Sequence, residues 1–314
     1  MQAWAVTCQG CELNQGAGNG RRAADGSALV AGDGPILAIV DQLQDQTVEL
    51  VLAGHTHRIT NFVRGRITVA EGLNAGASYS VAQLIVRDGD VQWVGAATRV
   101  ARNLGVAKRP DVRAIVDDAN ARTAVLRNQV IGTQKFDIKR APTRLFESAM
   151  GNMVADAMRA KYPGVDAAYT NSGGLRADLN CLPASAGEAA CEITWGEMFS
   201  VLPFGNRTVI ETLTGAQLEQ AFLNGFKPKC DPAFADRTGR FPQISGLKVQ
   251  YHCSGTTPVV DGIWKAPNGV GGTLTPVGPA DTVRLVTNDF MFTAGDADTL
   301  VVAGTNVPQP SAAL

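Results

Sequence analysis

The stretch that most constrains the fold is TNSGGLRADL, residues 170–179, in which an apolar segment ends in a tight glycine turn. The apolar residues before it predict a buried strand over 166–171, which delivers the turn at its carboxyl end, where α/β folds usually bind ligands. Glycine allows the backbone to take positive φ and to approach a ligand closely. Asn171 and Arg176 supply an amide and a fork of charged donors on either side. The sequence therefore predicts an anion-recognition turn at a strand end.

Length and charge limit the classes of protein and partner. A chain of 314 residues suits two domains with enough apolar content to bury both cores. The formal net charge is −1 and no run of lysine or arginine stands out, so we expect no binding to a nucleic-acid polymer or an anionic membrane. No apolar stretch reaches the roughly 20 residues of a membrane span, and the N-terminus lacks the segments of a signal peptide. Any phosphate recognition is therefore expected to be local.

The cysteines fall into near-neighbour pairs. The chain has 6 of them: Cys8 and Cys11, Cys181 and Cys191, Cys230 and Cys253. Two pairs bracket Gly-, Pro- or Ala-rich loops, which favours disulfides that close surface loops in an oxidising compartment over a zinc site. The CQGC spacing of Cys8 and Cys11 is also compatible with a redox or metal pair, or with free thiols.

A helix and a short strand precede a pair of histidines. The apolar spacing predicts an amphipathic helix over 35–46 and a short buried strand over 47–54. His55 and His57 follow that strand directly, so both imidazoles can point to one side. Taken alone, such a pair is more often a polar turn than a metal site. Alternating apolar and polar residues over 64–100 then predict a strand meander.

The remaining elements are predicted from spacing, caps and turn residues. Proline at the start and alternating charge predict an exposed helix over 110–128. The others are a strand over 130–138, an amphipathic helix over 147–161, a helix over 213–224 with Thr214 as N-cap, and a strand over 241–253 bent at Gly246.

Three motifs together resemble a known family. The glycine turn, VLPFGN with Phe204, and TNDFMFTAGDADT with Phe290 resemble the C-terminal domain of the 5'-nucleotidase family, secreted metallophosphoesterases that dephosphorylate nucleotides. VLAGHTH resembles the last metal motif of the same family. The resemblance implies an α/β (α+β) fold. The C-terminal part of a metallophosphoesterase β-sandwich with helices would occupy 1–105, a linker helix 106–128, and the α/β substrate-binding domain 129–314.

The resemblance implies only part of a metal centre. His55 and His57 would supply the last ligands of a site for two divalent ions, Zn, Mn or similar. Such a centre also needs carboxylates, an asparagine and further histidines. The chain has no DxH near its start and no GNHE or GNHD, and Cys8 stands where the family has a histidine. We therefore expect most of the catalytic domain to be missing, with no catalytic residue in this chain, because the sequence is a fragment or its lineage lost the chemistry.

The resemblance also implies a set of substrate-binding residues: Arg144, Asn171, Gly173, Gly174, Arg176, Phe204, Asn206, Phe290 and Asp296. Phe204 and Phe290 would hold the base between their rings, and Asn206 would lie at its edge. Arg144 would lie on the phosphate or sugar side, although it can equally pair with Glu147 at a helix start.

Two further points qualify this set. A phenylalanine after proline, as at Phe204, is by default a packing residue. The family pattern GGDG is AGDA in this chain, with Ala294 and Ala297 around the Asp296 motif, where the family places a carboxylate on ribose or base.

The implied function is that of a phosphoric monoester hydrolase of the 5'-nucleotidase type, which removes phosphate from nucleoside monophosphates with the help of metal ions. This chain alone is expected to bind a nucleotide and to be inactive. The alternatives are a 2',3'-cyclic-nucleotide phosphodiesterase or nucleotide-sugar hydrolase of the same family, a non-catalytic nucleotide-binding protein, and a secreted α/β protein without a ligand. The expected location is extracellular, periplasmic or the cell surface. The sequence selects no base, metal or oligomeric state.

Overall fold

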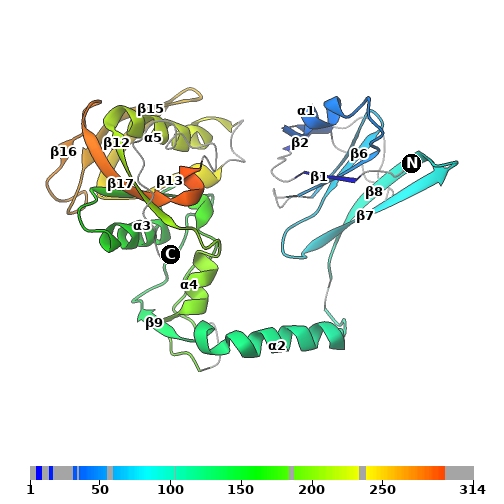
Figure 1. The fold of residues 1–314 in the computed structure, drawn as a ribbon, viewed down its shortest axis with the longest axis horizontal. Helices are drawn as coiled ribbons and strands as arrows, with labels where there is room; N and C mark the ends of the chain where they lie inside the picture. The colour runs from blue at the N-terminus through cyan, green and yellow to red at the C-terminus, as the bar shows by residue number, and fades with distance from the viewer. Residues whose placement is uncertain are drawn as a thin grey trace. The chain divides into compact units, whose positions relative to one another are not determined.

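The computed structural model describes residues 5–8, 14–16, 31–33, 35–54, 59–102, 104–183, 187–232 and 238–293. The chain divides into two compact units, Met1–Pro110 and Asp111–Leu314 (Figure 1). This division falls inside the predicted linker, 106–128, and the three predicted domain boundaries stay predictions. Among the described residues, no helix is long and apolar enough to cross a membrane.

The first unit contains a four-stranded sheet in the order β1-β4-β6-β5. Its elements are β1 (Ala5–Cys8), α1 (Pro35–Gln42), β4 (Leu50–Ala53), β5 (Thr60–Arg64) and β6 (Ile67–Glu71). β4 pairs in parallel with β1 and β6, and β5 runs antiparallel to β6. The core joins α1 to the sheet through Ile36, Val40, Val48, Val51, Phe62, Ile67 and Val69. The predicted helix followed by a parallel strand is therefore confirmed, although the helix ends at Gln42.

The predicted meander continues from this sheet into a long hairpin. β7 (Ser78–Arg87) and β8 (Asp90–Val100) pair antiparallel along their length. Asp88 and Gly89 join them with φ values of 53° and 86°, as in turns that match the twist of a hairpin. A second small pair is formed by β2 (Asn14–Gly16) and β3 (Ala31–Asp33).

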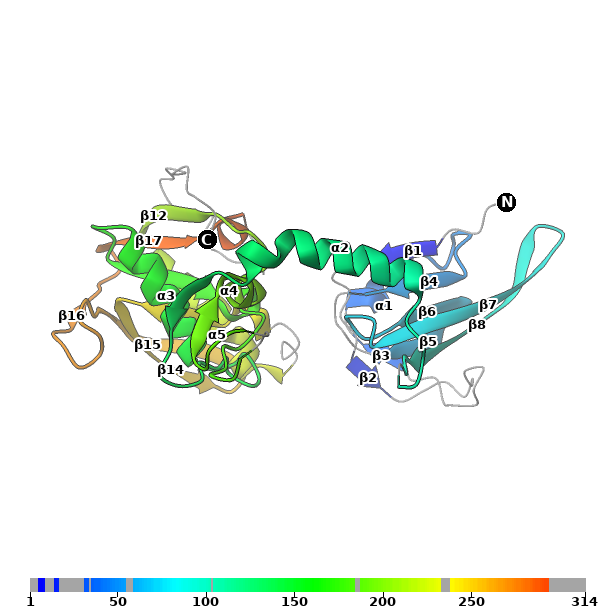
Figure 2. The same cartoon turned by 90° about the horizontal axis from the view of Figure 1, so that it is seen from below.

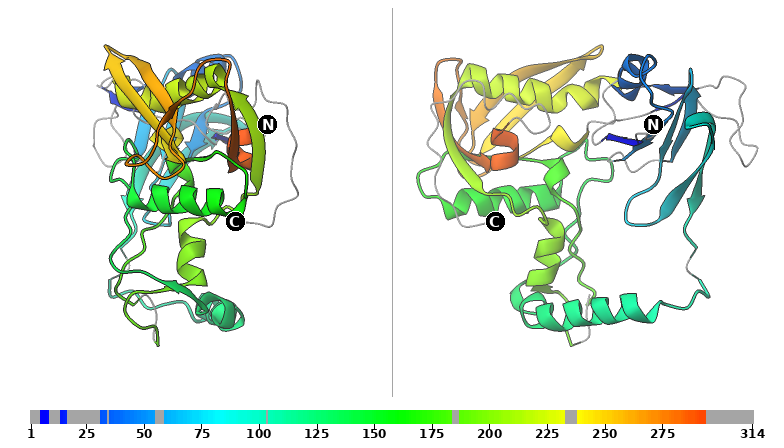
Figure 3. Two further views of the ribbon diagram at one scale, coloured as in Figure 1. Left: turned by 90° about the vertical axis from the view of Figure 1, so that its left-hand side faces the viewer. Right: turned by 45° about the vertical axis from the view of Figure 1, so that its right-hand side comes forward.

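The second unit is built on the sheet β12-β17-β10-β13. Its strands are β10 (Ala167–Asn171), β12 (Thr208–Thr214), β13 (Pro242–Ser245) and β17 (Thr282–Asn288). The central strands β10 and β17 are parallel, and both outer strands are antiparallel to their neighbours. α3 (Ala149–Lys161) covers one face, while α5 (Gly215–Cys230) covers the other with β14 (Leu247–Ser254) and β15 (Thr257–Lys265) (Figures 1 and 3).

Alternation along β10 explains these two cores. Successive side chains of a strand point to opposite faces of its sheet. Ala167 and Tyr169 therefore pack in the cluster around α5, and Ala168 packs in the cluster around α3. Every residue of β10 is buried, as expected of a central strand covered on both faces. The expected α/β fold of the C-terminal part is confirmed.

The remaining elements connect these layers. They are α2 (Pro110–Arg127), β9 (Val130–Thr133), η1 (Ser172–Gly174), β11 (Glu192–Thr194), α4 (Trp195–Val201), η3 (Thr238–Arg240), β16 (Thr275–Pro276) and α6 (Asp289–Phe292). Figure 2 shows α2 along its length, and none of its residues is buried. The strand predicted over 130–138 ends at Thr133, because only that part pairs with β11; Ile138 makes an isolated bridge with Leu179.

Thr214 is the N-cap of α5, as predicted. Its hydroxyl accepts a hydrogen bond from the Gln217 backbone, and the Gln217 side chain accepts one from the Thr214 backbone, which together form a capping box. The helix runs to Cys230, beyond the predicted end. The extension is stabilised by Phe226, which is buried and stacks on Tyr251 with ring centroids 3.7 Å apart.

Two of the expected disulfides are present. Cys230–Cys253 links the end of α5 to β14, with Cα atoms 5.3 Å apart, and Cys181–Cys191 closes the loop that follows the glycine turn. Cys11 and the side chain of Cys8 lie outside the described residues.

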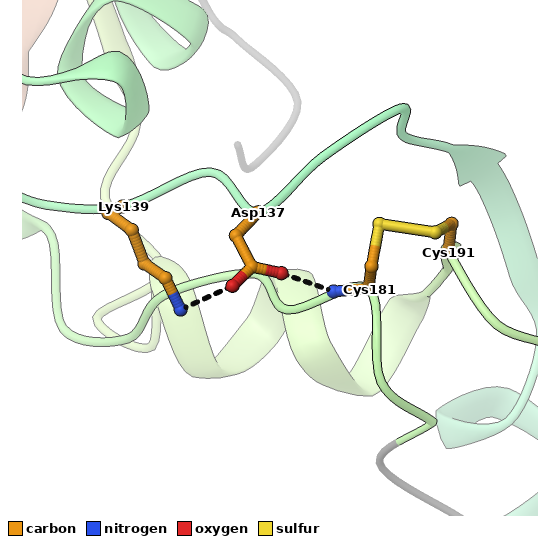
Figure 4. The surroundings of a disulfide bond; sticks show 4 residues. All are labelled: Asp137, Lys139, Cys181 and Cys191. Atoms are coloured by element: carbon orange, nitrogen blue, oxygen red, sulfur yellow. Dashed lines mark hydrogen bonds and ion pairs between the residues drawn. A yellow bond between two sulfur atoms is a disulfide. The ribbon is translucent and has the colours of Figure 1, made fainter.

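Asp137 holds the Cys181–Cys191 loop from outside (Figure 4). Its carboxylate accepts a hydrogen bond from the Cys181 backbone N–H at 2.8 Å. The same carboxylate forms an ion pair with the Lys139 ammonium group at 3.0 Å. The backbone hydrogen bond, followed by that from Lys139, lowers the pKa of Asp137 below its ordinary value of 3.8. The ionised form is therefore favoured in the folded state.

This shift predicts a pH dependence of stability. A carboxyl group whose pKa is lower in the folded state stabilises the protein above its unfolded pKa, and this stabilisation is lost as pH falls through the folded value. The Asp137→Asn variant should therefore lose less free energy of unfolding than the wild type when pH falls from 7 to below about 3.9. Urea denaturation across this range measures the difference. Parallel pH profiles for the two proteins would contradict it.

Gly246 turns the chain from one sheet into another. The sequence predicted one bent strand over 241–253; the structure instead has β13 and β14 in different sheets, with Gly246 between them. Its φ is 77°, a conformation that strongly favours glycine. A Cβ atom at this position would stand 2.3 Å from the Asp166 carbonyl oxygen.

A matched pair of variants separates the two reasons for this glycine. Gly269 has a φ of 78°, and a Cβ added to it would have no other atom within 4 Å. Gly269→Ala should therefore lose only about 1–2 kcal/mol, the cost of the left-handed conformation for a residue with a Cβ. Gly246→Ala adds the clash with Asp166, which we expect to raise the loss by about 1–3 kcal/mol. Denaturant titration of both variants measures this difference, and equal losses would show that the close approach contributes nothing.

Candidate functional site

The candidate site lies at one edge of the second unit's sheet. Because β10 and β17 are parallel, their carboxyl ends meet at this edge, where a pocket opens. Its lining comprises Val154, Thr170, Gly174, Leu202, Phe204, Gly205, Asn206 and Asn288. Three predicted site residues, Gly174, Phe204 and Asn206, therefore line one pocket.

The glycine turn forms η1, directly after β10. Ser172 fixes it, since its backbone N–H donates to the Phe241 carbonyl at 3.0 Å and its hydroxyl contacts the Gly239 carbonyl at 3.2 Å. A Cβ on Gly173 would lie 3.0 Å from the Cα of Gly239 and 3.2 Å from Nδ2 of Asn171. The glycine therefore lets η1 pack against η3 and around the buried Asn171 amide.

Arg176 lies beside the turn and beside an aromatic ring. Its backbone N–H donates to the Val201 carbonyl at 2.9 Å, and its Nη1 donates to the Gly173 carbonyl at 3.3 Å. The guanidinium carbon is 5.6 Å from the centre of the Phe204 ring, within the range of a cation–π contact. Phe204 is 57 % exposed, so the alternative of a buried packing residue is wrong. The arrangement offers charged donors next to a flat apolar surface.

Phe290 is fixed to the same edge as Phe204 by backbone contacts. It lies on α6 and is 43 % exposed. Asp289 and Arg207 exchange two hydrogen bonds: Asp289 N–H donates to the Arg207 carbonyl at 2.8 Å, and Arg207 N–H donates to the Asp289 carboxylate at 3.1 Å. The segments that carry the two exposed rings are therefore tied together.

The loop that contains Arg144 is held against the glycine turn. Arg144 has a φ of 55°, and its carbonyl accepts a hydrogen bond from the Ser172 hydroxyl at 3.2 Å. Gln243 holds the next part of the loop, because its side chain donates to the Phe146 carbonyl and accepts from the Ser148 N–H, both at 3.0 Å. The backbone of Arg144 is therefore beside η1, although the residue is not part of the pocket lining.

Sequence reasoning missed Arg140. Its guanidinium donates to the Asp178 carboxylate at 2.9 Å and to the Arg176 carbonyl at 2.8 Å. Burial of the Asp178 carboxyl opposes its ionisation, but the hydrogen bonds from Arg140 lower its pKa below the ordinary value. Arg140 thus fixes the backbone of Arg176 by a hydrogen bond between residues that are 36 positions apart in the sequence. No local sequence pattern indicates this contact.

Three predicted site residues lie outside the described residues: His55, His57 and Asp296. Within the described parts of the chain, no group of three or more His, Cys, Asp and Glu side chains could hold a metal ion.

Comparisons with known proteins agree with the C-terminal fold. The family model described as 5'-nucleotidase, C-terminal domain, matches residues 124–302. A 5'-nucleotidase precursor from Thermus thermophilus has a TM-score of 0.60 at 23 % identity, over 84 % of this chain and 54 % of that one. A putative 5'-nucleotidase from Staphylococcus aureus has a TM-score of 0.61 at 15 % identity, over 95 % and 58 % of the two chains. At these identities the likeness concerns the fold alone.

Curated relatives are much longer than this chain. A cell wall protein of Listeria monocytogenes is 31 % identical over 265 residues, which are 80 % of this chain and 32 % of the relative. A trifunctional nucleotide phosphoesterase of Bacillus subtilis is 26 % identical over 264 residues, 79 % of this chain and 17 % of the relative. The chain thus spans a third or less of either relative. Since the family model covers more than half of it, the chain belongs to the 5'-nucleotidase family through its C-terminal domain.

Proposed function

We propose that this chain carries the nucleotide-binding part of a 5'-nucleotidase-type hydrolase. The observation that supports this most is the contact between the Arg176 guanidinium and the exposed ring of Phe204, 5.6 Å apart, at a pocket where parallel strands end. A nucleotide combines an anionic phosphate with a flat base, and these two groups need charged donors and an aromatic surface.

Each proposed binding residue has a distinct role. Arg176 offers bidentate hydrogen bonds to an acceptor oxygen of the ligand. Phe204 and Phe290 offer stacking surfaces for the base, and Asn206 lines the pocket next to Phe204. Arg144 and Asn171 are proposed on the phosphate or sugar side. All of these groups are attached to a sheet that is buried on both faces, so the ligand would be oriented by a rigid scaffold.

The reaction proposed for the complete family arrangement is metal-dependent removal of phosphate from nucleoside monophosphates. His55 and His57 remain proposed ligands of a two-ion centre, with Zn or Mn as candidates. The described residues supply binding and orientation of the substrate, and no catalytic step is assigned to them. We accordingly expect this chain by itself to bind a nucleotide without hydrolysing it.

A second candidate is a hydrolase for another nucleotide ester, such as a 2',3'-cyclic nucleotide or a nucleotide sugar. Phe204 and Gly205, which line the pocket, are both exposed to solvent. One relative is named as a trifunctional nucleotide phosphoesterase, which supports a pocket that accepts several nucleotides. Competition of cyclic nucleotides and nucleotide sugars with AMP for binding would distinguish these substrates.

The proposed location is outside the cytoplasm. Two disulfides close loops of the second unit, and disulfides persist in oxidising compartments. One relative is named as a cell wall protein. These observations support an extracellular, periplasmic or cell-surface protein.

The stacking role of Phe204 is tested with a matched aromatic control. Phe204→Ala should weaken AMP binding by about 1–3 kcal/mol, since it removes one base-stacking surface. Phe136 is 67 % exposed and outside the pocket lining, so Phe136→Ala should leave the affinity unchanged. Isothermal titration calorimetry of both variants and the wild type measures this. An equal affinity of Phe204→Ala and wild type would remove the stacking role, and absence of AMP binding by the wild type would remove the proposed function.

The role of Arg176 in phosphate recognition is tested by comparing two ligands. Arg176→Lys keeps the charge but loses the planar fork that binds an anion through two hydrogen bonds. AMP binding should therefore weaken about tenfold or more, whereas binding of adenosine, which has no phosphate, should change little. Calorimetry with both ligands gives the result. If both affinities fall equally, Arg176 supports the pocket as a whole and does not recognise the phosphate.

A further inference from the structure

Two polar side chains from neighbouring strand ends line the candidate pocket, although sequence reasoning selected neither. Thr170 is next to last in β10 and Asn288 is last in β17, and both line the pocket. Thr170 lies on the same face of the sheet as Ala168, since side chains of a strand alternate, and Ala168 packs in the cluster around α3. Thr170 and Asn288 therefore form the sheet side of a pocket on the α3 face.

The contacts of Asn288 fix the direction of its hydrogen bond with Thr170. Its Oδ1 accepts a hydrogen bond from the Met291 backbone N–H at 2.9 Å, which caps α6. Its Nδ2 therefore faces Thr170 and donates to Oγ1 at 3.1 Å. Reversing the amide would place its NH2 group against the N–H of Met291, and two donors cannot pair. The Thr170 hydroxyl is consequently the acceptor in this contact.

This contact leaves the proton of the Thr170 hydroxyl available. A hydroxyl group has one proton to donate and two lone pairs that accept. Within the described parts of the chain, the bond from Asn288 is the only hydrogen bond of the Thr170 side chain, and it uses a lone pair. Thr170 is 3 % exposed, and a buried O–H without an acceptor is unfavourable. An occupant of the pocket that offers an acceptor atom would remove this penalty.

The rest of the lining indicates which part of a nucleotide fits the pocket. Val154, Leu202 and Phe204 are apolar, the two glycines have no side chain, and none of the lining residues is charged. A phosphate group binds best to charged donors. A nucleotide base is flat and presents a few acceptor atoms at its edge, which can pair with a neutral donor. The lining is therefore better suited to a base than to a phosphate.

We propose that the Thr170 hydroxyl donates a hydrogen bond to an acceptor atom at the edge of the bound base, and that Asn288 is the positioning residue that keeps the hydroxyl proton free for this contact. This inference rests on the proposed nucleotide-binding function. It assigns to the neutral strand ends a part in recognition of the base, separate from the charged donors beside the glycine turn.

Two substitutions of Thr170 separate the hydroxyl from the rest of the side chain. Thr170→Val keeps the branched shape and removes the hydroxyl, so AMP binding should weaken about three- to tenfold, as for the loss of one hydrogen bond. Thr170→Ser keeps the hydroxyl and should bind AMP within about twofold of the wild type. Isothermal titration calorimetry measures both affinities. A loss in Thr170→Ser as large as that in Thr170→Val would overturn the role of the hydroxyl.

Analogues of AMP test whether the hydroxyl contacts the base itself. In three analogues one ring nitrogen that accepts hydrogen bonds, N1, N3 or N7, is replaced by C–H. One of them should bind the wild type about three- to tenfold more weakly than AMP does, whereas Thr170→Val should bind that analogue and AMP equally. An equal loss in Thr170→Val with AMP and all three analogues would show a general disturbance of the pocket and overturn the proposal.

A matched control and the wild type distinguish failure of this inference from failure of the proposed function. Thr287 is buried at the same end of the sheet but outside the pocket lining, and its hydroxyl contacts the Met291 sulfur at 3.7 Å. Thr287→Val should therefore leave AMP binding unchanged, and a loss equal to that of Thr170→Val would overturn the proposal. If the wild type binds no AMP, the proposed function fails as well. If the wild type and Thr170→Val bind AMP within about twofold of each other, only the inference is overturned.

A second measurement does not depend on the variants being folded. In a crystal structure of the wild-type chain with bound AMP, Oγ1 of Thr170 should lie about 3 Å from an acceptor atom of the base. The hydrogen bond from Nδ2 of Asn288 to the same oxygen should be retained. A base whose acceptor atoms all lie more than about 3.5 Å from this oxygen would overturn the proposal.

Discussion

The site depends on the parallel pairing of β10 with β17. In register, Ala167 faces Leu285 and Ala168 faces Val286, so both strands end at the same edge of the sheet. The two outer strands are antiparallel and therefore begin at that edge. The segments that leave β10 and β17 and those that enter β12 and β13 are thus brought together by hydrogen-bond register alone. An antiparallel central pair would place the glycine turn and α6 at opposite ends of the sheet.

Packing on both faces of the sheet holds the carboxyl ends of β10 and β17 in place. Buried side chains of β10 and β17 contact α3 on one face and α5 on the other, so neither strand can slide without moving both cores. Polar contacts then transmit this rigidity to the loops. Ser172 ties the turn to the Arg144 loop, Gln243 holds the continuation of that loop, and Arg140 holds the backbone of Arg176. Short loops on a rigid sheet are a common way to position binding groups.

Local chemistry explains which features were predictable from sequence. The glycine turn after a buried strand, the Thr214 cap and the bend at Gly246 are each encoded by a few neighbouring residues, and each is present in the structure. Asn288 and Arg140 were missed because their partners are 117 and 36 residues away. The end of α5 was misplaced for a similar reason, since the tertiary contact of Phe226 with Tyr251 extends the helix. Long-range pairing supplies information that no local window contains.

The phenylalanines of the second unit differ in how much of their surface is exposed to water. Phe222 and Phe226 are buried and stabilise the core around α5, whereas Phe204 and Phe290 keep about half of their surface in water. Leaving such a ring exposed forgoes part of the roughly 1.5–3 kcal/mol that burial of a large apolar side chain contributes. That energy becomes available when a flat apolar group covers the ring. The ring of Phe204 lines the pocket and lies 5.6 Å from the Arg176 guanidinium, so this ring contributes less to the stability of the fold than the buried rings around α5 do.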